Sequence, residues 1–112
     1  MQFTDLHPDE QLALVALSRA IVRADDVVTP AEGRRVARIA LELGEEAYRR
    51  EFARAVESFP DEAALKRFLE SISRPEARSI IYDTILDLAA ADELTPAEEP
   101  LIRWLEQAWG LQ

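Results

Sequence analysis

One acidic stretch decides the fold and occurs twice: residues 24–32 read ADDVVTPAE, and residues 90–98 read AADELTPAE. In each copy the Thr-Pro-Ala-Glu segment predicts a helix start. A threonine at the N-cap accepts a backbone N–H, a proline suits the first helical position, and the glutamate accepts the threonine N–H in return. The two copies therefore predict two related corners, each leading from one helix into the next.

Apolar side chains outside these corners recur at spacings of three and four residues, which predicts amphipathic helices. We expect helices at about 8–24, 29–43, 45–58, 61–72, 74–91 and 95–109. A further capping box is predicted in the segment Ser-Arg-Pro-Glu at 73–76, where the fifth helix would begin. In the third helix the expected apolar stripe consists of Tyr48, Phe52, Ala55, Val56 and Phe59.

The two helix–connector–helix units, at about 8–43 and 74–109, are related in pattern and flank a helical insert at about 45–72. Related helical hairpins commonly pack about an approximate two-fold axis, and the insert would close the bundle. A length of 112 residues suits one hydrophobic core. We therefore expect residues 1–112 to form a single all-α domain, a helical bundle with two pseudo-symmetric units.

The composition excludes several classes of protein. The chain has no cysteine, which excludes disulfides and thiolate zinc sites. Its 22 acidic and 13 basic residues give a net charge of −9, which would repel a phosphate backbone, so no nucleic-acid partner is expected. The first residues lack the pattern of a secretory signal, and the longest apolar run, at 12–18, is too short for membrane insertion. We expect a cytoplasmic protein.

At the two corners the chain resembles a known family. The pattern Ala-Asp-x-x-Val/Leu-Thr-Pro-Ala-Glu, written twice around a helical insert, is similar to the tellurite-resistance TerB-like family and to the N-terminal TerB-like domain of DjlA-type membrane co-chaperones. The resemblance covers about 12–111. It implies an all-α bundle, an acidic cluster that binds divalent metal, and a role in stress-response or membrane-associated complexes. The family usually has Ala-Asp-Gly at the corner, whereas Asp26 replaces that glycine here.

Two aspartates at the corners need an explanation beyond helix capping. Asp25 and Asp92 each follow an inward-facing stripe and lie at a predicted helix C-terminus, where the helix dipole disfavours an anion. One interpretation is that each aspartate ties its corner to the next helix by a hydrogen bond. The other is that Asp25, Glu32, Asp92 and Glu98 together hold a divalent cation. Carboxylate ligands without His or Cys favour Mg²⁺ or Ca²⁺.

No catalytic group is expected. His7 is the only histidine, and no serine has a recognisable histidine partner in the sequence. Asp83 and Asp87 are expected to be solvated, and Trp104 and Trp109 to anchor the core. We predict a non-enzymatic interaction module for a protein partner, with a divalent cation as its one cofactor. Two alternatives stay open: a metal-dependent hydrolase that uses the acidic cluster to activate water, and a homodimeric structural protein.

Overall fold

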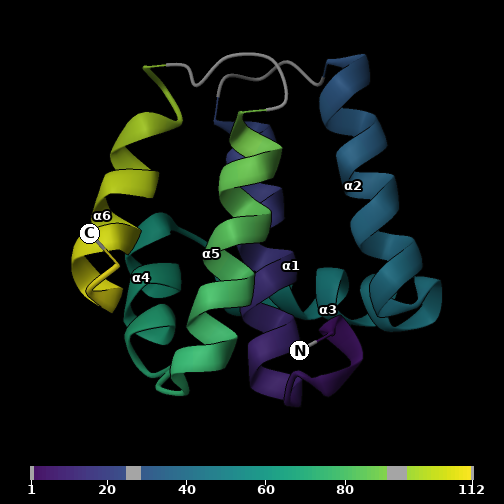
Figure 1. Ribbon diagram of the computed structural model, residues 1–112, viewed down its shortest axis with the longest axis horizontal. Helices are drawn as coiled ribbons and strands as arrows, with labels where there is room; N and C mark the ends of the chain where they lie inside the picture. Colours follow the sequence, from purple (N-terminus) through teal and green to yellow (C-terminus); the bar gives the residue numbers. More distant parts are fainter. Residues whose placement is uncertain (1, 25–28, 91–95, 112) are drawn as a thin grey trace.

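Two helices form the centre of the bundle in the computed structural model, which describes residues 2–24, 29–90 and 96–111. Helix α1 (Pro8–Arg23) lies behind α5 (Pro75–Ala89) in Figure 1, and the two pack against each other. Every residue of α1 from 12 to 18 is buried, because α3, α4 and α5 all pack on this helix. A helix that is apolar on all sides needs such complete cover.

The other helices surround this pair. Helix α2 (Pro30–Leu43) and helix α6 (Glu99–Trp109) lie on opposite sides of α5, while α3 (Glu45–Ser58) and α4 (Glu62–Glu70) pack on α1. A short 3₁₀ helix, η1 (Phe3–Asp5), contacts α2. The principal extents of 30 × 29 × 28 Å are nearly equal, as one globular core requires. The described residues contain helices and turns and no strand, which confirms the predicted all-α class.

The second Thr-Pro-Ala-Glu segment does not open its helix as the first one does. Helix α2 begins at Pro30 as predicted, but α6 begins at Glu99, and residues 96–98 form turns. Thr95 lies outside the described residues. The reason is Pro100. In a helix that started at Pro96, Pro100 would lack the N–H for an intrahelical bond and its ring would clash with the carbonyl four residues before it. In the observed frame Pro100 occupies the first turn, where no such bond is needed.

The capping box predicted at 73–76 is also wrong. Helix α5 begins at Pro75, so Arg74 and not Ser73 is the N-cap residue, and no side chain caps the helix there. The residue before a proline is pushed away from the helical region, and Arg74 is accordingly extended, with φ −68° and ψ 122°. In the first copy the proline directly follows the threonine, whereas here one residue separates Ser73 from Pro75. The capping frame is therefore shifted by one position.

Helix α3 buries only part of the predicted stripe, since Tyr48 and Phe59 are partly buried against the core. Ala55 is buried, but Phe52 is 38% exposed and Val56 is 48% exposed. Glu51 is 1% exposed and forms ion pairs with Arg50 and Arg54. The stripe placed five apolar residues on one face, yet the helix packs on α1 through a face that includes Glu51. Two large apolar side chains of α3 are consequently left at the surface.

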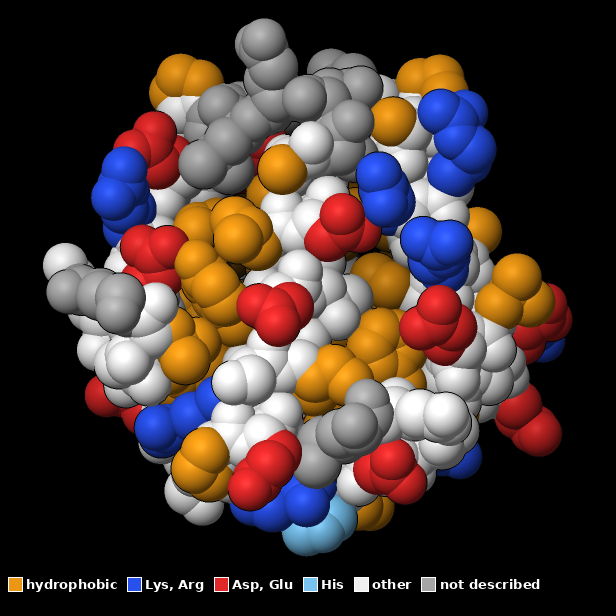
Figure 2. All heavy atoms as spheres, in the orientation of Figure 1, with side chains coloured by type: hydrophobic (Ala, Val, Ile, Leu, Met, Phe, Trp, Pro, Cys, Tyr) orange, Lys and Arg blue, Asp and Glu red, His pale blue; other side chains and the backbone are white. Residues whose placement is uncertain are grey.

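Polar contacts join the helices across the bundle surface. Tyr82 Oη on α5 donates a hydrogen bond to Glu106 Oε2 on α6, and this bond, with burial, raises the pKa of Tyr82 to about 12. Arg35 on α2 pairs with Asp87 on α5 at 2.9 Å. Figure 2 shows acidic side chains along the ridge of α5 with hydrophobic side chains on both sides of it. Asp83 and Asp87 are exposed, as predicted.

None of the helices in the described part of the chain combines the length and the apolar character that crossing a bilayer requires.

Candidate functional site

The helix ends that flank the two predicted corners lie at one end of the bundle. The C-terminal ends of α1 and α5 and the N-terminal ends of α2 and α6 all lie at the top of Figure 1. Of the four predicted metal ligands, Asp25 and Asp92 fall in segments that lie outside the described residues. The structure places Glu32 in the first turn of α2 and Glu98 immediately before α6, and these two helices lie on opposite sides of α5.

Glu32 forms the capping box that the sequence predicts. The Thr29 N–H donates to Glu32 Oε1 at 3.1 Å, and the Glu32 N–H donates to Thr29 Oγ1 at 3.1 Å. The side chain of Glu32 is buried at 4% relative exposure. A carboxylate offers about four lone-pair sites, so one such bond leaves acceptor capacity for a further ligand. Capping and metal binding are therefore compatible at this residue.

Replacing Thr29 by alanine is expected to lower the free energy of unfolding by about 1 kcal/mol, because the Glu32 N–H loses its acceptor. Urea unfolding measures this loss. Thr84→Ala is the matched control, since the Thr84 hydroxyl donates to the Ile80 carbonyl within α5 and caps no helix end. Equal losses in the two variants would contradict the assigned role of Thr29.

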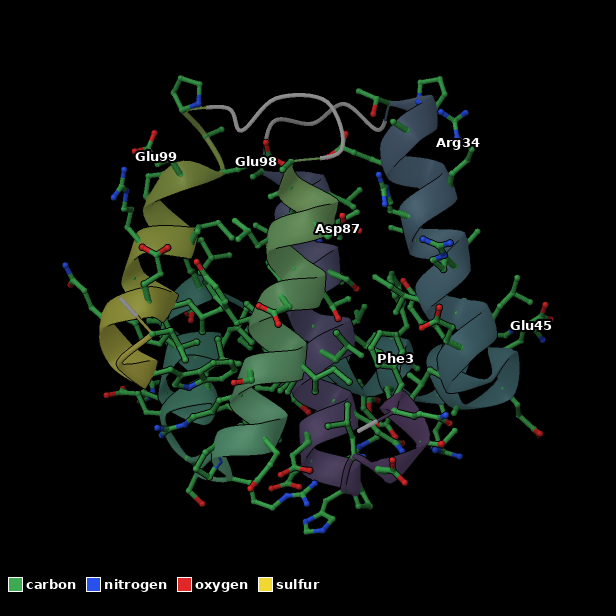
Figure 3. All side chains as sticks on the ribbon, viewed as in Figure 1. Phe3, Arg34, Glu45, Asp87, Glu98 and Glu99 are labelled. Carbon is green, nitrogen blue, oxygen red and sulfur yellow. The ribbon has the colours of Figure 1, made fainter. Side chains whose placement is uncertain are left out.

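Glu98 is the most buried of the predicted ligands that the structure describes. It is 1% exposed and immediately precedes α6, with φ −87° and ψ −32°. Figure 3 shows Glu98 beside the C-terminal end of α5, at the same end of the bundle as the first turn of α2, which carries Arg34. Within residues 2–24, 29–90 and 96–111, no three carboxylate or histidine side chains gather as metal ligands. A ligand set would thus need the aspartates of the two connectors.

A second candidate site lies on α1 and α3. A cavity of about 220 Å³ lies among α1, α2 and α3 and is lined chiefly by apolar groups, with Val22 and Val36 opposite Tyr48 and Phe52. A larger cavity of about 510 Å³ lies among α1, α3 and α4, with Ala20 and Val56 in its wall. Arg19 and Arg23 line both cavities. These two cavities, with the arginines common to both, are called the α1–α3 groove below.

The arginines of the groove lie one helical turn apart on α1. The Arg19 guanidinium carbon is 5.9 Å from the centre of the Phe52 ring, within the range of a cation–π contact. Burial, and secondly the charge of Arg23, lower the pKa of Arg19. Among the described residues neither arginine takes part in an ion pair. The smaller cavity of the groove is therefore lined by two cations and by no anion among the described residues, on a protein of net charge −9.

The sequence analysis did not single out the groove. Two signals in the sequence point to it: Arg19 and Arg23 at a spacing of four within an otherwise apolar helix, and Glu51 inside the stripe of the third helix. On α3 the acidic residue Glu51 is buried and paired, whereas Phe52 and Val56 are exposed.

One comparison with known proteins identifies the family of this chain. The sequence model of the family described as "Tellurite resistance protein TerB" matches residues 11–112, which is most of the chain. No curated protein matches the chain. No solved structure matches it either.

Proposed function

Because the chain belongs to the tellurite resistance TerB family, we propose that it is a non-enzymatic interaction module whose acidic corners hold a divalent cation. The observation that supports this function is that the four helix ends flanking the two acidic segments lie at one end of the bundle. His7, the only imidazole of the chain, lies at the opposite end as the N-cap residue of α1. The acidic corners thus have no imidazole base beside them.

The residues that would hold the cation are Asp25 and Glu32 at the first corner and Asp92 and Glu98 at the second. All four donors are carboxylates, which suit the hard ions Mg²⁺ and Ca²⁺. Ligands from both corners would join the α1–α2 unit to the α5–α6 unit. Such a module would act in the cytoplasm, in stress-response or membrane-associated complexes, by presenting a surface to a protein partner.

The test is a titration of chelator-treated protein with Ca²⁺ and with Mg²⁺, recorded by amide NMR and by thermal unfolding. We expect saturable shifts in residues 24–32 and 90–98. Since the folded state would bind the ion and the unfolded chain would not, an ion concentration of 100 Kd adds about 2.7 kcal/mol to the free energy of unfolding. Asp25→Asn and Asp92→Asn should each remove most of this gain.

Asp83→Asn is the matched control, because Asp83 is exposed on α5 and the substitution changes the charge by the same amount. This variant should bind the ion as the parent protein does. Weak, unsaturable shifts spread over the whole surface, or a gain in stability that survives both connector substitutions, would refute the cation site.

A further inference from the structure

We propose that the α1–α3 groove binds an acidic amphipathic helix of a protein partner. This inference rests on the proposed function, because it names the surface and the kind of partner that the interaction module uses. The occupant would carry two apolar side chains on one face, one for each cavity, and carboxylates between them for Arg19 and Arg23. Helices recognised in grooves present anchors at this kind of spacing.

Helix α3 supplies an exposed apolar side chain to each of the two cavities. Phe52 lines the smaller cavity and Val56 lines the larger one, and the two residues are one helical turn apart. They are 38% and 48% exposed, in contrast to the buried Ala55 between them. Apolar side chains exposed beside concave surfaces mark sites of interaction. Phe52 and Val56 thus offer one apolar contact in each cavity to a single partner element.

Charge complementarity selects an acidic partner. Arg19 and Arg23 stand where the two cavities meet, since both residues line both cavities. Asp61 and Glu62 line the larger cavity as well; Asp61 Oδ1 accepts the Ala64 N–H at 2.8 Å, and Glu62 pairs with Lys66 at 3.8 Å. In the smaller cavity the charged lining residues are Arg19 and Arg23, with no carboxylate among the described residues to offset them. Arginine also forms bidentate bonds with carboxylates, which fixes the orientation of the partner.

Two other occupants fit the groove less well. An anionic membrane surface would meet the arginines, but it would also meet a protein of net charge −9, which it repels. A second copy of this chain carries the same net charge, and a two-fold arrangement groove to groove would bring like-charged arginines together. A short acidic helix in the groove faces Arg19 and Arg23 and covers less of the negatively charged surface than a membrane or a second copy would.

The experiment selects peptides from a displayed random library on the intact protein and then measures the affinity of the enriched sequences by fluorescence anisotropy. We expect sequences with Leu, Ile or Phe at helical spacing and Asp or Glu between them. Arg19→Glu combined with Arg23→Glu should weaken their binding at least about tenfold, and Phe52→Ala should do the same. Amide NMR should place the bound peptide on α1 and α3.

Two matched controls lie on α2. Arg34→Glu combined with Arg38→Glu makes the same change of charge on exposed residues outside the groove, and Leu41→Ala shortens an apolar side chain that is 70% exposed. Both should leave affinity within about twofold of the parent value, as surface positions outside an interface do. Circular dichroism of each variant would check that it remains folded.

Four results would overturn the inference: no enriched sequence, enriched sequences whose binding survives the groove substitutions, phosphatidylserine-containing vesicles that bind through the same residues, and a dimer that Arg19→Glu with Arg23→Glu dissociates. Peptides that bind elsewhere on the surface would refute the groove and leave the interaction module in place. The cation titration uses no peptide, and the peptide experiment adds no cation. A negative result in the first would refute the cation site alone, and a negative result in the second would refute the groove alone.

Discussion

Replacing Trp109 by alanine is expected to lower the free energy of unfolding by about 3–5 kcal/mol. The side chain is 4% exposed and packs in the core, so truncation leaves a cavity where the indole was. The indole Nε1–H donates to the Leu69 carbonyl at 2.9 Å, which joins α6 to α4. In the variant the Leu69 carbonyl still accepts the N–H of Ile72. The loss of packing therefore accounts for the larger part of the destabilisation. A small domain has only about 5–15 kcal/mol of stability in total.

Urea unfolding followed by far-ultraviolet circular dichroism measures the effect without depending on tryptophan fluorescence. Trp104→Ala is the matched control, because Trp104 is only partly buried and its ring has Lys66 on its open side, 5.3 Å from the centroid. This variant should lose clearly less stability. Trp109→Phe, which keeps most of the packing and removes the donor, should lose about 1 kcal/mol. Equal losses at the two tryptophans would show that α6 is not anchored through Trp109.

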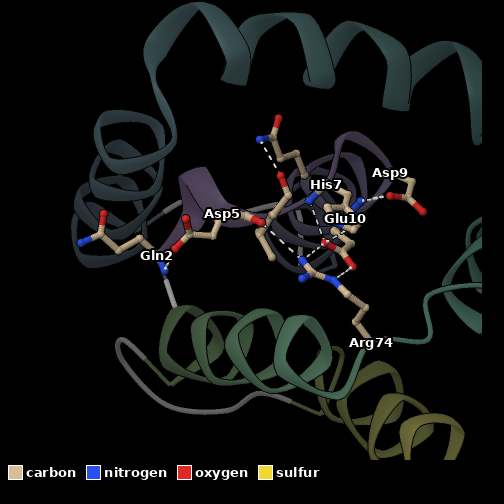
Figure 4. Close-up of polar contacts among 8 residues, drawn as sticks. Gln2, Asp5, His7, Asp9, Glu10 and Arg74 are labelled. Atoms are coloured by element: carbon tan, nitrogen blue, oxygen red, sulfur yellow. Dashed lines mark hydrogen bonds and ion pairs between the residues drawn. The ribbon is translucent and has the colours of Figure 1, made fainter.

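The second large effect is expected at the junction of α1 with α5. Arg74 donates to both carboxylate oxygens of Glu10, at 2.8 Å from Nε and at 2.5 Å from Nη2. The His7 N–H donates to Glu10 Oε1 at 2.7 Å, and Arg74 also reaches the Asp5 carbonyl, as Figure 4 shows. Glu10 is 3% exposed, so its carboxylate depends on these donors in place of water.

Glu10→Ala is expected to lower the free energy of unfolding by about 1–3 kcal/mol, because the substitution leaves the His7 N–H without its acceptor. This expected loss is smaller than the loss from breaking a fully buried ion pair, because solvent reaches the Arg74 side chain, which is 33% exposed. The matched control is Glu99→Ala, which removes an exposed pair with Arg103 within α6 and should change stability by less than about 0.5 kcal/mol.

The same contact makes stability depend on pH. The Arg74 hydrogen bond, aided by the His7 N–H and opposed by burial, lowers the pKa of Glu10 below its ordinary value of 4.5. The folded state therefore holds the proton less tightly than the unfolded chain does. This contribution to stability is complete above the unfolded pKa and is lost as pH falls through the folded pKa. Urea midpoints measured from pH 6 downward should fall more steeply for the parent protein than for Glu10→Gln, and parallel curves would contradict the assignment.

Local signals in the sequence were enough to predict several elements. Helices α2 and α3 have the predicted ends, because Thr29 and Glu32 cap the first and Gly44, with φ 108°, separates the two. The burial of Trp109 and the exposure of Asp83 also match expectation. The start of α6 could have been predicted as well, since Pro100 is visible in the sequence and forbids the frame of the first copy.

The sequence by itself determined the helical class, the start of α2 and most helix ends, because capping, proline and glycine act within one turn of the chain. Only the tertiary structure decided that Arg74 binds Glu10, and that α3 buries Glu51 while exposing Phe52 and Val56. Periodicity identifies an apolar face but not the helix that covers it. The positively charged groove on α1 and α3 arises from that choice of partner.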